Sequence, residues 1–459
     1  MKKRALAILL AVGLVATGFL VGCTPAAQEP AVDTTETETP AESEPDTTDE
    51  EEADEVQATG DVTTITFLSG KPEVFSQLQD TARLFMDANP DIVVEVIGAE
   101  AGASPYQTLT VMYSAGNAPS IFMIEQGDVF NVEHAVMDLS GIDFLANAST
   151  AAAAAVTSDR GMMAAPFAVE SVGFIYNRTL IENTLGREFD PNSITSNVAL
   201  EAIFQELEDA GVAPVVISPE TWSLGAHYMM YLYANQFPNS PENVAFTEEL
   251  RAGNVDLMEN EIFNGWLDTF DIMKAFNAEI NDPLAASMDT NSAMMAQERV
   301  AFYFMGTFTW TVMEQMGANP DDFGLMPVPV TADDRDANTR LLSIYSMYIA
   351  IDQAQNTPEQ QEASLRFLEW LLHDEVGQTR VVQYLGILPA YSHITVPPVD
   401  PLNKSLQEYQ LNGRLLNFNI TYPSDHWQAL GNDFQAYLAD HLDRAGFAQR
   451  IQEFWINAQ

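Results

Sequence analysis

Three short, largely apolar segments separated by helix-like stretches restrict most strongly how this chain can fold. The segments are Ile65 to Leu68, Ile92 to Ile97 and Ile121 to Ile124. Between them, apolar residues recur at the spacing of a helix face, and Asn89-Pro90 and Gly116-Asn117 end the two expected helices. Strands of this kind, joined by helices, predict a parallel sheet covered on both faces.

Ligands bind beyond the carboxyl ends of the strands in such sheets. The loops that begin at Ser69 and at Glu125 follow the first and third predicted strands. We therefore expect these two loops to point at one site.

A second mixed unit is expected from Pro166 onward. Its predicted strands are 174–177, 215–217, 300–304 and 344–351, and its predicted helices are 262–276, 359–373 and 427–456. A chain of 459 residues is too long for one ordinary core and suits two domains. The sequence contains no internal repeat.

The charge balance excludes several classes of partner. The chain has 66 acidic and 19 basic residues, a formal net charge of −47, and 47% hydrophobic residues. The apolar fraction is typical of a globular protein, whereas the charge argues against nucleic acids and anionic membrane surfaces as electrostatic partners. A single cysteine excludes an intramolecular disulfide and a cysteine-based metal site.

That cysteine follows an amino-terminal leader. A basic start precedes an apolar run from Ala5 to Val21, and the run closes with Leu20-Val21-Gly22-Cys23, which resembles a bacterial lipobox. This pattern predicts a signal peptide over 1–22 and a lipid on Cys23, and the alternative is an uncleaved membrane anchor. Residues 24–61 hold 14 acidic and no basic side chains, which predicts a disordered tether.

No catalytic, nucleotide-binding or metal-binding motif is found. The chain has no glycine-rich phosphate loop, no His-x-x-x-His pair and no Gly-x-Ser-x-Gly elbow. Asp333-Asp334-Arg335-Asp336 lacks the spacing of a calcium loop and is expected to be a solvated turn. We therefore expect no cofactor and no metal.

Carboxylates, amides and aromatic residues gather instead at predicted loops and strand ends. Carboxylates accept hydrogen bonds from hydroxyl groups, and aromatic rings stack on apolar ring faces, which is what a neutral sugar requires. The predicted ligand-binding residues are Ser69, Lys71, Glu125, Gln126, Asp128, Glu170, Glu220, Trp222, Gly306, Thr307, Phe308, Tyr345 and Trp427. Trp310 and Met305 are expected to pack inside.

The order of several motifs resembles the extracellular solute-binding proteins of ABC sugar importers, the group that includes maltose-binding protein. The motifs are Pro166-Phe167-Ala168-Val169-Glu170 leading into Ile175-Tyr176-Asn177-Arg178, Asn117-Ala118-Pro119-Ser120-Ile121, Val300-Ala301-Phe302 leading to Gly306-Thr307-Phe308, Gly386-Ile387-Leu388-Pro389-Ala390, and Trp427. The resemblance covers nearly all of 62–459.

This resemblance implies an α/β, two-lobed periplasmic-binding-protein-like (type II) fold with a hinge between the lobes. One lobe would comprise 62–168 and 342–389, and the other 170–340 and 391–459. Glu170 and Glu220 match family carboxylates that bind sugar hydroxyls, and Trp222, Phe308 and Trp427 match stacking positions. Phe308 stands where many relatives have Trp, which leaves the identity of the sugar open.

The resulting hypothesis is a monomeric, lipid-anchored protein on the outer side of the cytoplasmic membrane. It would capture a carbohydrate and deliver it to the transmembrane subunits of an ABC permease without breaking a bond. One alternative is a secreted glycoside hydrolase that uses Glu170 and Glu220 as its two carboxylates. Another is a binding protein for a non-sugar solute such as a polyamine, which would use the same Glu and Trp residues.

Overall fold

The computed structural model describes residues 62–99, 104–240, 242–418, 420, 422–423 and 425–458. The predicted signal peptide, Cys23 and the predicted tether lie outside these described residues. Within them, no helix is long and apolar enough to cross a membrane. The described residues belong to one compact unit, Ala58–Gln459.

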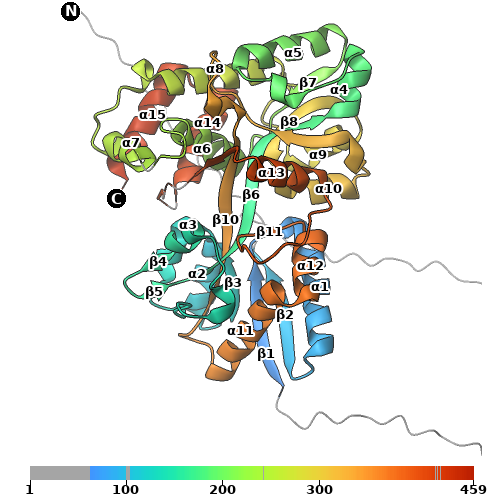
Figure 1. Cartoon of the computed structure of the whole chain (residues 1–459). Coiled ribbons are helices and arrows are strands. Elements are labelled where there is room, and N and C mark those ends of the chain that lie inside the picture. The colour runs from blue at the N-terminus through green and yellow to red at the C-terminus, as the bar shows by residue number, and fades with distance from the viewer. Residues whose placement is uncertain are drawn as a thin grey trace, which may run out of the picture. The chain divides into compact units, whose positions relative to one another are not determined.

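One mixed sheet contains most of the strands (Figure 1). Its strands are β1 (Thr63–Ser69), β2 (Ile92–Gly98), β3 (Ile121–Ile124), β6 (Ala165–Asn177), β7 (Ala213–Val216), β8 (Val300–Gly306), β9 (Phe323–Met326), β10 (Leu341–Ile351), β11 (Leu388–Pro389) and β12 (Leu415–Asn417). The main order is β2-β1-β3-β10-β6-β8-β7. The short strands β4 (Thr157–Ser158) and β5 (Gly161–Met162) pair separately.

Helices cover the sheet and fill the rest of the unit. The α-helices are α1 (Phe75–Ala88), α2 (Pro105–Ala115), α3 (Thr150–Ala154), α4 (Arg178–Leu185), α5 (Asn197–Asp209), α6 (Met229–Ala234), α7 (Glu242–Arg251), α8 (Glu261–Ala275), α9 (Met288–Ala296), α10 (Trp310–Gln315), α11 (Pro358–His373), α12 (Glu375–Thr379), α13 (Pro401–Leu411), α14 (His426–Leu438) and α15 (Arg444–Asn457). The π-helical segment η5 (Ser223–Tyr228) and the 3-10 segments η2 (Gln126–Val132) and η7 (Thr307–Thr309) carry side chains of the site.

The prediction for the first unit is confirmed. β1 pairs in parallel with β2 and with β3. Phe67 packs into one hydrophobic cluster with Ile121 and Met123, whereas Leu68 and Phe122 pack into another. Since neighbouring residues of a strand point to opposite faces, both faces of this sheet are buried.

Two long strands connect this region to the rest of the sheet. β10 pairs antiparallel with β3 near its end at Ile351 and with β6 along most of its length, and β6 continues into pairs with β8 and β9. Figure 1 shows β6 and β10 running between the group of β1, β2 and α11 and the group of β8, α9 and α14. The strand predicted at 174–177 is therefore only the end of a 13-residue strand.

The predicted helix over 427–456 is wrong as a single element. It is interrupted after Leu438, where Asp440 adopts a left-handed φ of 58°. The Asp443 side chain then accepts a hydrogen bond from the Gly446 backbone N–H and begins α15. Periodicity alone does not detect this break, because the apolar spacing continues on both sides of it.

Candidate functional site

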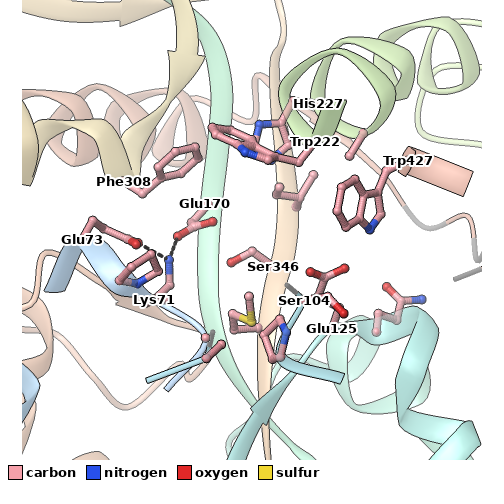
Figure 2. Close-up of a pocket in the computed structure, with 18 of the residues that line it drawn as sticks. Lys71, Glu73, Ser104, Glu125, Glu170, Trp222, His227, Phe308, Ser346 and Trp427 are labelled. Atoms are coloured by element: carbon pink, nitrogen blue, oxygen red, sulfur yellow. Dashed lines mark hydrogen bonds and ion pairs between the residues drawn. The ribbon is translucent and has the colours of Figure 1, made fainter. Parts of the chain in front are cut away.

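A cavity of about 820 Å³ is lined by loops and strand ends from across the unit (Figure 2). The predicted residues that line it are Ser69, Lys71, Glu125, Gln126, Asp128, Glu170, Glu220, Trp222, Phe308, Tyr345 and Trp427. Gly306 and Thr307 do not line it. The loops after the first and third strands therefore meet at one cavity, as their position predicted.

Lys71 anchors one end of the cavity. Its backbone N–H donates to the Ser69 hydroxyl at 3.2 Å, and its Nζ donates to Glu73 Oε1 at 3.0 Å and to Glu170. Burial alone would lower the pKa of Lys71, but the charges of Glu170 and Glu73 outweigh burial and raise it. The ammonium group is thus held by two carboxylates and also lies 5.8 Å from the centre of the Phe308 ring.

Gly306 and Thr307 position Phe308 instead of contacting the cavity. A Cβ atom at Gly306 would lie 2.2 Å from the Phe308 ring, so only glycine leaves room for the ring in this orientation. The Thr307 hydroxyl accepts a hydrogen bond from the Ser171 backbone N–H at 3.4 Å and is buried. Neither residue lines the cavity, and the role in ligand binding expected for Gly306 and Thr307 stays a prediction.

Trp222, His227 and Phe308 form an aromatic group on one wall. Ring centres are 5.4 Å apart for Trp222 and His227, 6.1 Å for Trp222 and Phe308, and 5.5 Å for His227 and Phe308. Burial lowers the pKa of His227 to about 4; Glu170 acts against this shift and Lys71 adds to it. His227 is therefore neutral at physiological pH.

Close helix packing brings Trp427 to the same cavity. A Cβ atom at Gly225 in η5 would lie 2.2 Å from the Trp427 carbonyl oxygen, and one at Gly431 in α14 would lie 2.3 Å from the Thr221 carbonyl oxygen. These two glycines let the backbones of η5 and α14 approach closely. Trp427, in the first turn of α14, thus lies above the cavity on the side opposite Phe308 (Figure 2).

Glu220 lines the cavity, but its carboxylate is used within the protein. Oε1 accepts a hydrogen bond of 2.6 Å from the Met288 backbone N–H at the start of α9. Oε2 is buried, and no donor among the described residues contacts it. Burial raises the pKa of this carboxyl group. A ligand could reach Oε2 only if the side chain moved.

A second pair of carboxylates follows β3. Burial, followed by the charge of Asp128, raises the pKa of Glu125 to about 7. Burial raises the pKa of Asp128 to about 6, although a 3.1 Å hydrogen bond from the Asn131 amide opposes the shift. Tyr422 lies nearby, because its carbonyl oxygen would be 3.3 Å from a Cβ atom at Gly127. Burial and the charges of both carboxylates raise the pKa of Tyr422. Burial thus disfavours the charged form of both carboxyls, and the charge of Asp128 adds to this effect at Glu125.

The floor of the cavity comes from an irregular part of β10. Its register with β6 shifts between Tyr345 and Met347 and again between Met347 and Tyr348. Such bulges turn side chains away from the regular alternation, and Tyr345, Ser346 and Met347 all line the cavity. The Tyr345 hydroxyl is hydrogen-bonded to Ser149 at 2.8 Å.

Sequence reasoning missed several lining residues, among them Glu73, His227, Ser346, Asp289 and Tyr422. Glu73 follows Lys71 by two positions, and this short spacing could have indicated that Glu73 also lines the cavity. His227 had no such signal, because it reaches the site through the π-helical geometry of η5. Among the described residues, no group of His, Cys, Asp and Glu has the arrangement needed to hold a metal ion.

Residues 81–399 match the family model of the bacterial extracellular solute-binding proteins. The chain belongs to this family. No curated protein sequence matches the chain significantly. Family membership agrees with the resemblance drawn from the motif order, and it indicates a binding protein that acts outside the cytoplasm.

Solved structures with a similar fold include several sugar-binding proteins. RafE in complex with raffinose is 18% identical over 86% of this chain and 99% of that chain, with a TM-score of 0.72. Ligand-free RafE from Streptococcus pneumoniae is 19% identical over 87% and 99% of the two chains, with a TM-score of 0.66. A sugar transporter protein from Bacillus licheniformis, in complex with stachyose, is 17% identical over 86% and 100%, with a TM-score of 0.66. These similarities establish the two-lobed α/β fold that the motif order predicted.

Proposed function

We propose that the protein captures a carbohydrate outside the cytoplasmic membrane and delivers it to the transmembrane subunits of an ABC importer. The observation that carries this proposal is one cavity walled by aromatic rings and carboxylates. These residues come from segments far apart in the sequence and include Trp222, Phe308, Trp427, Glu125, Asp128 and Glu170. Aromatic rings cover the apolar faces of a sugar, and carboxylates accept hydrogen bonds from its hydroxyl groups.

The structural relatives support a sugar as the ligand. RafE has been solved with raffinose and the B. licheniformis protein with stachyose, and both have the fold of this chain. A cavity of about 820 Å³ lies within the range typical of ligand sites. Membership of the solute-binding family supports a protein that binds its ligand and releases it chemically unchanged.

Ligand capture would shift an equilibrium between open and closed lobes. We place the crossings between lobes near 168–170, 340–342 and 389–391. Hydrophobic packing supports this placement: Ala168 belongs to the cluster around Phe67, whereas Val169 packs against the cluster around Tyr303. The register of β10 with β6 also shifts between Tyr345 and Tyr348, beside Ala168 and Val169, and such bulges favour a local bend of the strand. The lipid on Cys23 and the acidic tether would hold this monomeric unit at the outer face of the membrane.

A thermal-shift screen of the full chain tests the function. The panel contains mono-, di- and oligosaccharides together with putrescine and spermidine. A sugar that binds raises the melting temperature in a concentration-dependent way. A panel in which only the polyamines raise it would reject the carbohydrate proposal.

Two further measurements sharpen this test. Trp427→Ala should abolish the sugar-induced shift, whereas Trp370→Ala in α11, outside the cavity, should retain it. Incubation with the bound oligosaccharide should release no shorter sugar. Release that depends on Glu170 and Glu220 would instead support the glycoside hydrolase alternative.

A further inference from the structure

Charge is distributed unevenly around the cavity. Among the described lining residues, the carboxylates are Glu73, Glu125, Asp128, Glu170, Glu220 and Asp289. The only lysine or arginine among them is Lys71, and His227 is neutral at physiological pH because burial lowers its pKa. The walls therefore carry a surplus of negative charge, and the position of that surplus determines which ligand group fits.

Most of these carboxylates already have partners or lie at the rim. Glu170 and Glu73 share the ammonium group of Lys71. Glu220 accepts a hydrogen bond from the backbone at the start of α9, and Asp289 is exposed on the first turn of that helix. Glu170 and Glu73 are thus compensated by a cation, Glu220 has one backbone donor and a buried, unpartnered Oε2, and Asp289 is exposed to solvent.

Glu125 and Asp128 differ from the other four. Asp128 is buried and receives one hydrogen bond from Asn131, and no cation or hydrogen-bond donor among the described residues contacts the Glu125 carboxylate. The ionisable groups that interact with this pair are the two carboxyls themselves and Tyr422, which approaches from the segment before α14. Two adjacent carboxylates thus share a mostly enclosed position without a compensating positive charge.

Aromatic rings lie at the same end of the cavity. The Tyr422 backbone closely approaches the Glu125–Asp128 loop, since its carbonyl oxygen would lie 3.3 Å from a Cβ atom at Gly127. Figure 2 shows Trp427 and Glu125 together on the side of the cavity away from Lys71, Glu73 and Phe308. Carboxylates together with an aromatic face can bind an ammonium ion. The Trp427 ring, which lines the cavity, is the candidate for this face, because the Tyr422 ring stacks on His426 with ring centres 4.5 Å apart.

We propose that the Trp427–Glu125 end of the cavity binds a protonated amine, so that the captured carbohydrate carries a free amino group. This inference rests on the proposed function and narrows it to one class of sugar. A hydroxyl group would accept or donate hydrogen bonds there but would leave the negative charge uncompensated. An ammonium group compensates it, while the Lys71 end, already paired internally, contacts neutral hydroxyl groups.

The inference requires a specific pH dependence. Without a ligand, burial raises the pKa of Glu125 to about 7, with a further contribution from the charge of Asp128, and burial raises the pKa of Asp128 to about 6. A bound ammonium group requires the ionised carboxylates. For a carboxyl with a pKa of about 7, the ionised fraction rises roughly fifteenfold from about pH 5.5 to pH 7, and the affinity for an amino sugar should rise with it.

The experiment compares matched sugars by calorimetry on the full chain. The pairs are glucose and glucosamine, galactose and galactosamine, and cellobiose and the corresponding disaccharide of glucosamine, each with its N-acetylated form. We expect at least one amino sugar to bind tenfold or more tightly than both its neutral and its N-acetylated counterparts. We also expect that preference to increase from about pH 5.5 to pH 7.

Two single substitutions test whether the Glu125 end of the cavity causes the preference for an amino sugar. Glu125→Gln should remove the preference for the amino sugar and its pH dependence, so that the amino sugar and its neutral counterpart bind with similar affinity at about pH 5.5 and at pH 7. Glu133→Gln, at the end of the same segment but outside the cavity, should retain both.

Three results would overturn the inference. Neutral sugars that bind as tightly as their amino counterparts would refute it and leave the proposed function intact. Binding of putrescine or spermidine alone would refute both proposals, and a panel in which no amino sugar binds would refute the inference.

Discussion

Replacing Glu125 with glutamine should stabilise the ligand-free protein, and it should do so more at alkaline than at acidic pH. Burial and the neighbouring Asp128 raise the pKa of Glu125 from 4.5 to about 7. Below about pH 4.5 the carboxyl is protonated in both the folded and the unfolded chain, and its ionisation affects neither state. Between about pH 4.5 and 7 the folded state binds more protons than the unfolded state, so stability falls as the pH rises.

The size of the effect follows from the same two values. A pKa raised from 4.5 to about 7 corresponds to a cost of about 3 kcal/mol in the folded state above pH 7. Glu125 and Asp128 titrate together, and Glu125 keeps partial contact with solvent, so part of this cost belongs to the pair and part is screened. We expect Glu125→Gln to raise the free energy of unfolding by about 1–2 kcal/mol at pH 8 relative to its effect at pH 5.

Urea unfolding of the full chain at both pH values measures this difference. Glu133→Gln serves as the matched control, because Glu133 lies on the same segment but outside the cavity. The control should show no comparable pH-dependent gain. The reasoning fails if Glu125→Gln stabilises the protein equally at pH 5 and pH 8, because the carboxyl would then not be held in an unfavourable charged state.

Three other substitutions test the rest of the site. Lys71→Met should lower the free energy of unfolding by about 3–5 kcal/mol, because it leaves Glu170 and Glu73 without their cation. The double variant with Glu170→Gln should recover part of this loss, as measured by chemical unfolding. Gly225→Ala should lower the free energy of unfolding by about 1–3 kcal/mol and weaken ligand binding, because its Cβ would displace the backbone of α14 at Trp427. Unchanged thermal unfolding would show that η5 and α14 can move apart without cost. Trp222→Ala should weaken sugar binding at least about tenfold in calorimetry, and an affinity within about twofold of the unaltered protein would remove Trp222 from the site.

The sequence predicted individual strands and helices correctly where they depend on the spacing of neighbouring apolar residues. The apolar runs at 65–68, 92–97 and 121–124 are parallel strands, and the helix expected over 359–373 is α11. The expectation that Trp310 and Met305 pack inside is confirmed by their burial. Each of these features follows from the periodicity of neighbouring side chains.

Pairings between distant segments could not be predicted in the same way. Lys71 and Glu170 are 99 positions apart, and the Glu220 carboxylate meets a backbone group 68 positions away. The sequence suggests that Glu220 is available to a ligand, whereas the structure places it against the start of α9. The bulges of β10 depend on how β6 passes beside it, which the sequence of β10 alone does not reveal.

The cavity therefore has two ends that differ in how their charges are compensated. At the Lys71 end the protein supplies its own cation, so the charges of Glu73 and Glu170 are compensated without a ligand. At the Glu125 end, the described residues supply two carboxylates and one amide donor, from Asn131, but no cation, so the folded state remains less stable there until a ligand provides further donors. Binding sites commonly retain such a destabilised arrangement, because the free energy recovered on binding contributes to affinity. The same argument explains why removal of the Glu125 charge should stabilise the empty protein and weaken its selectivity together.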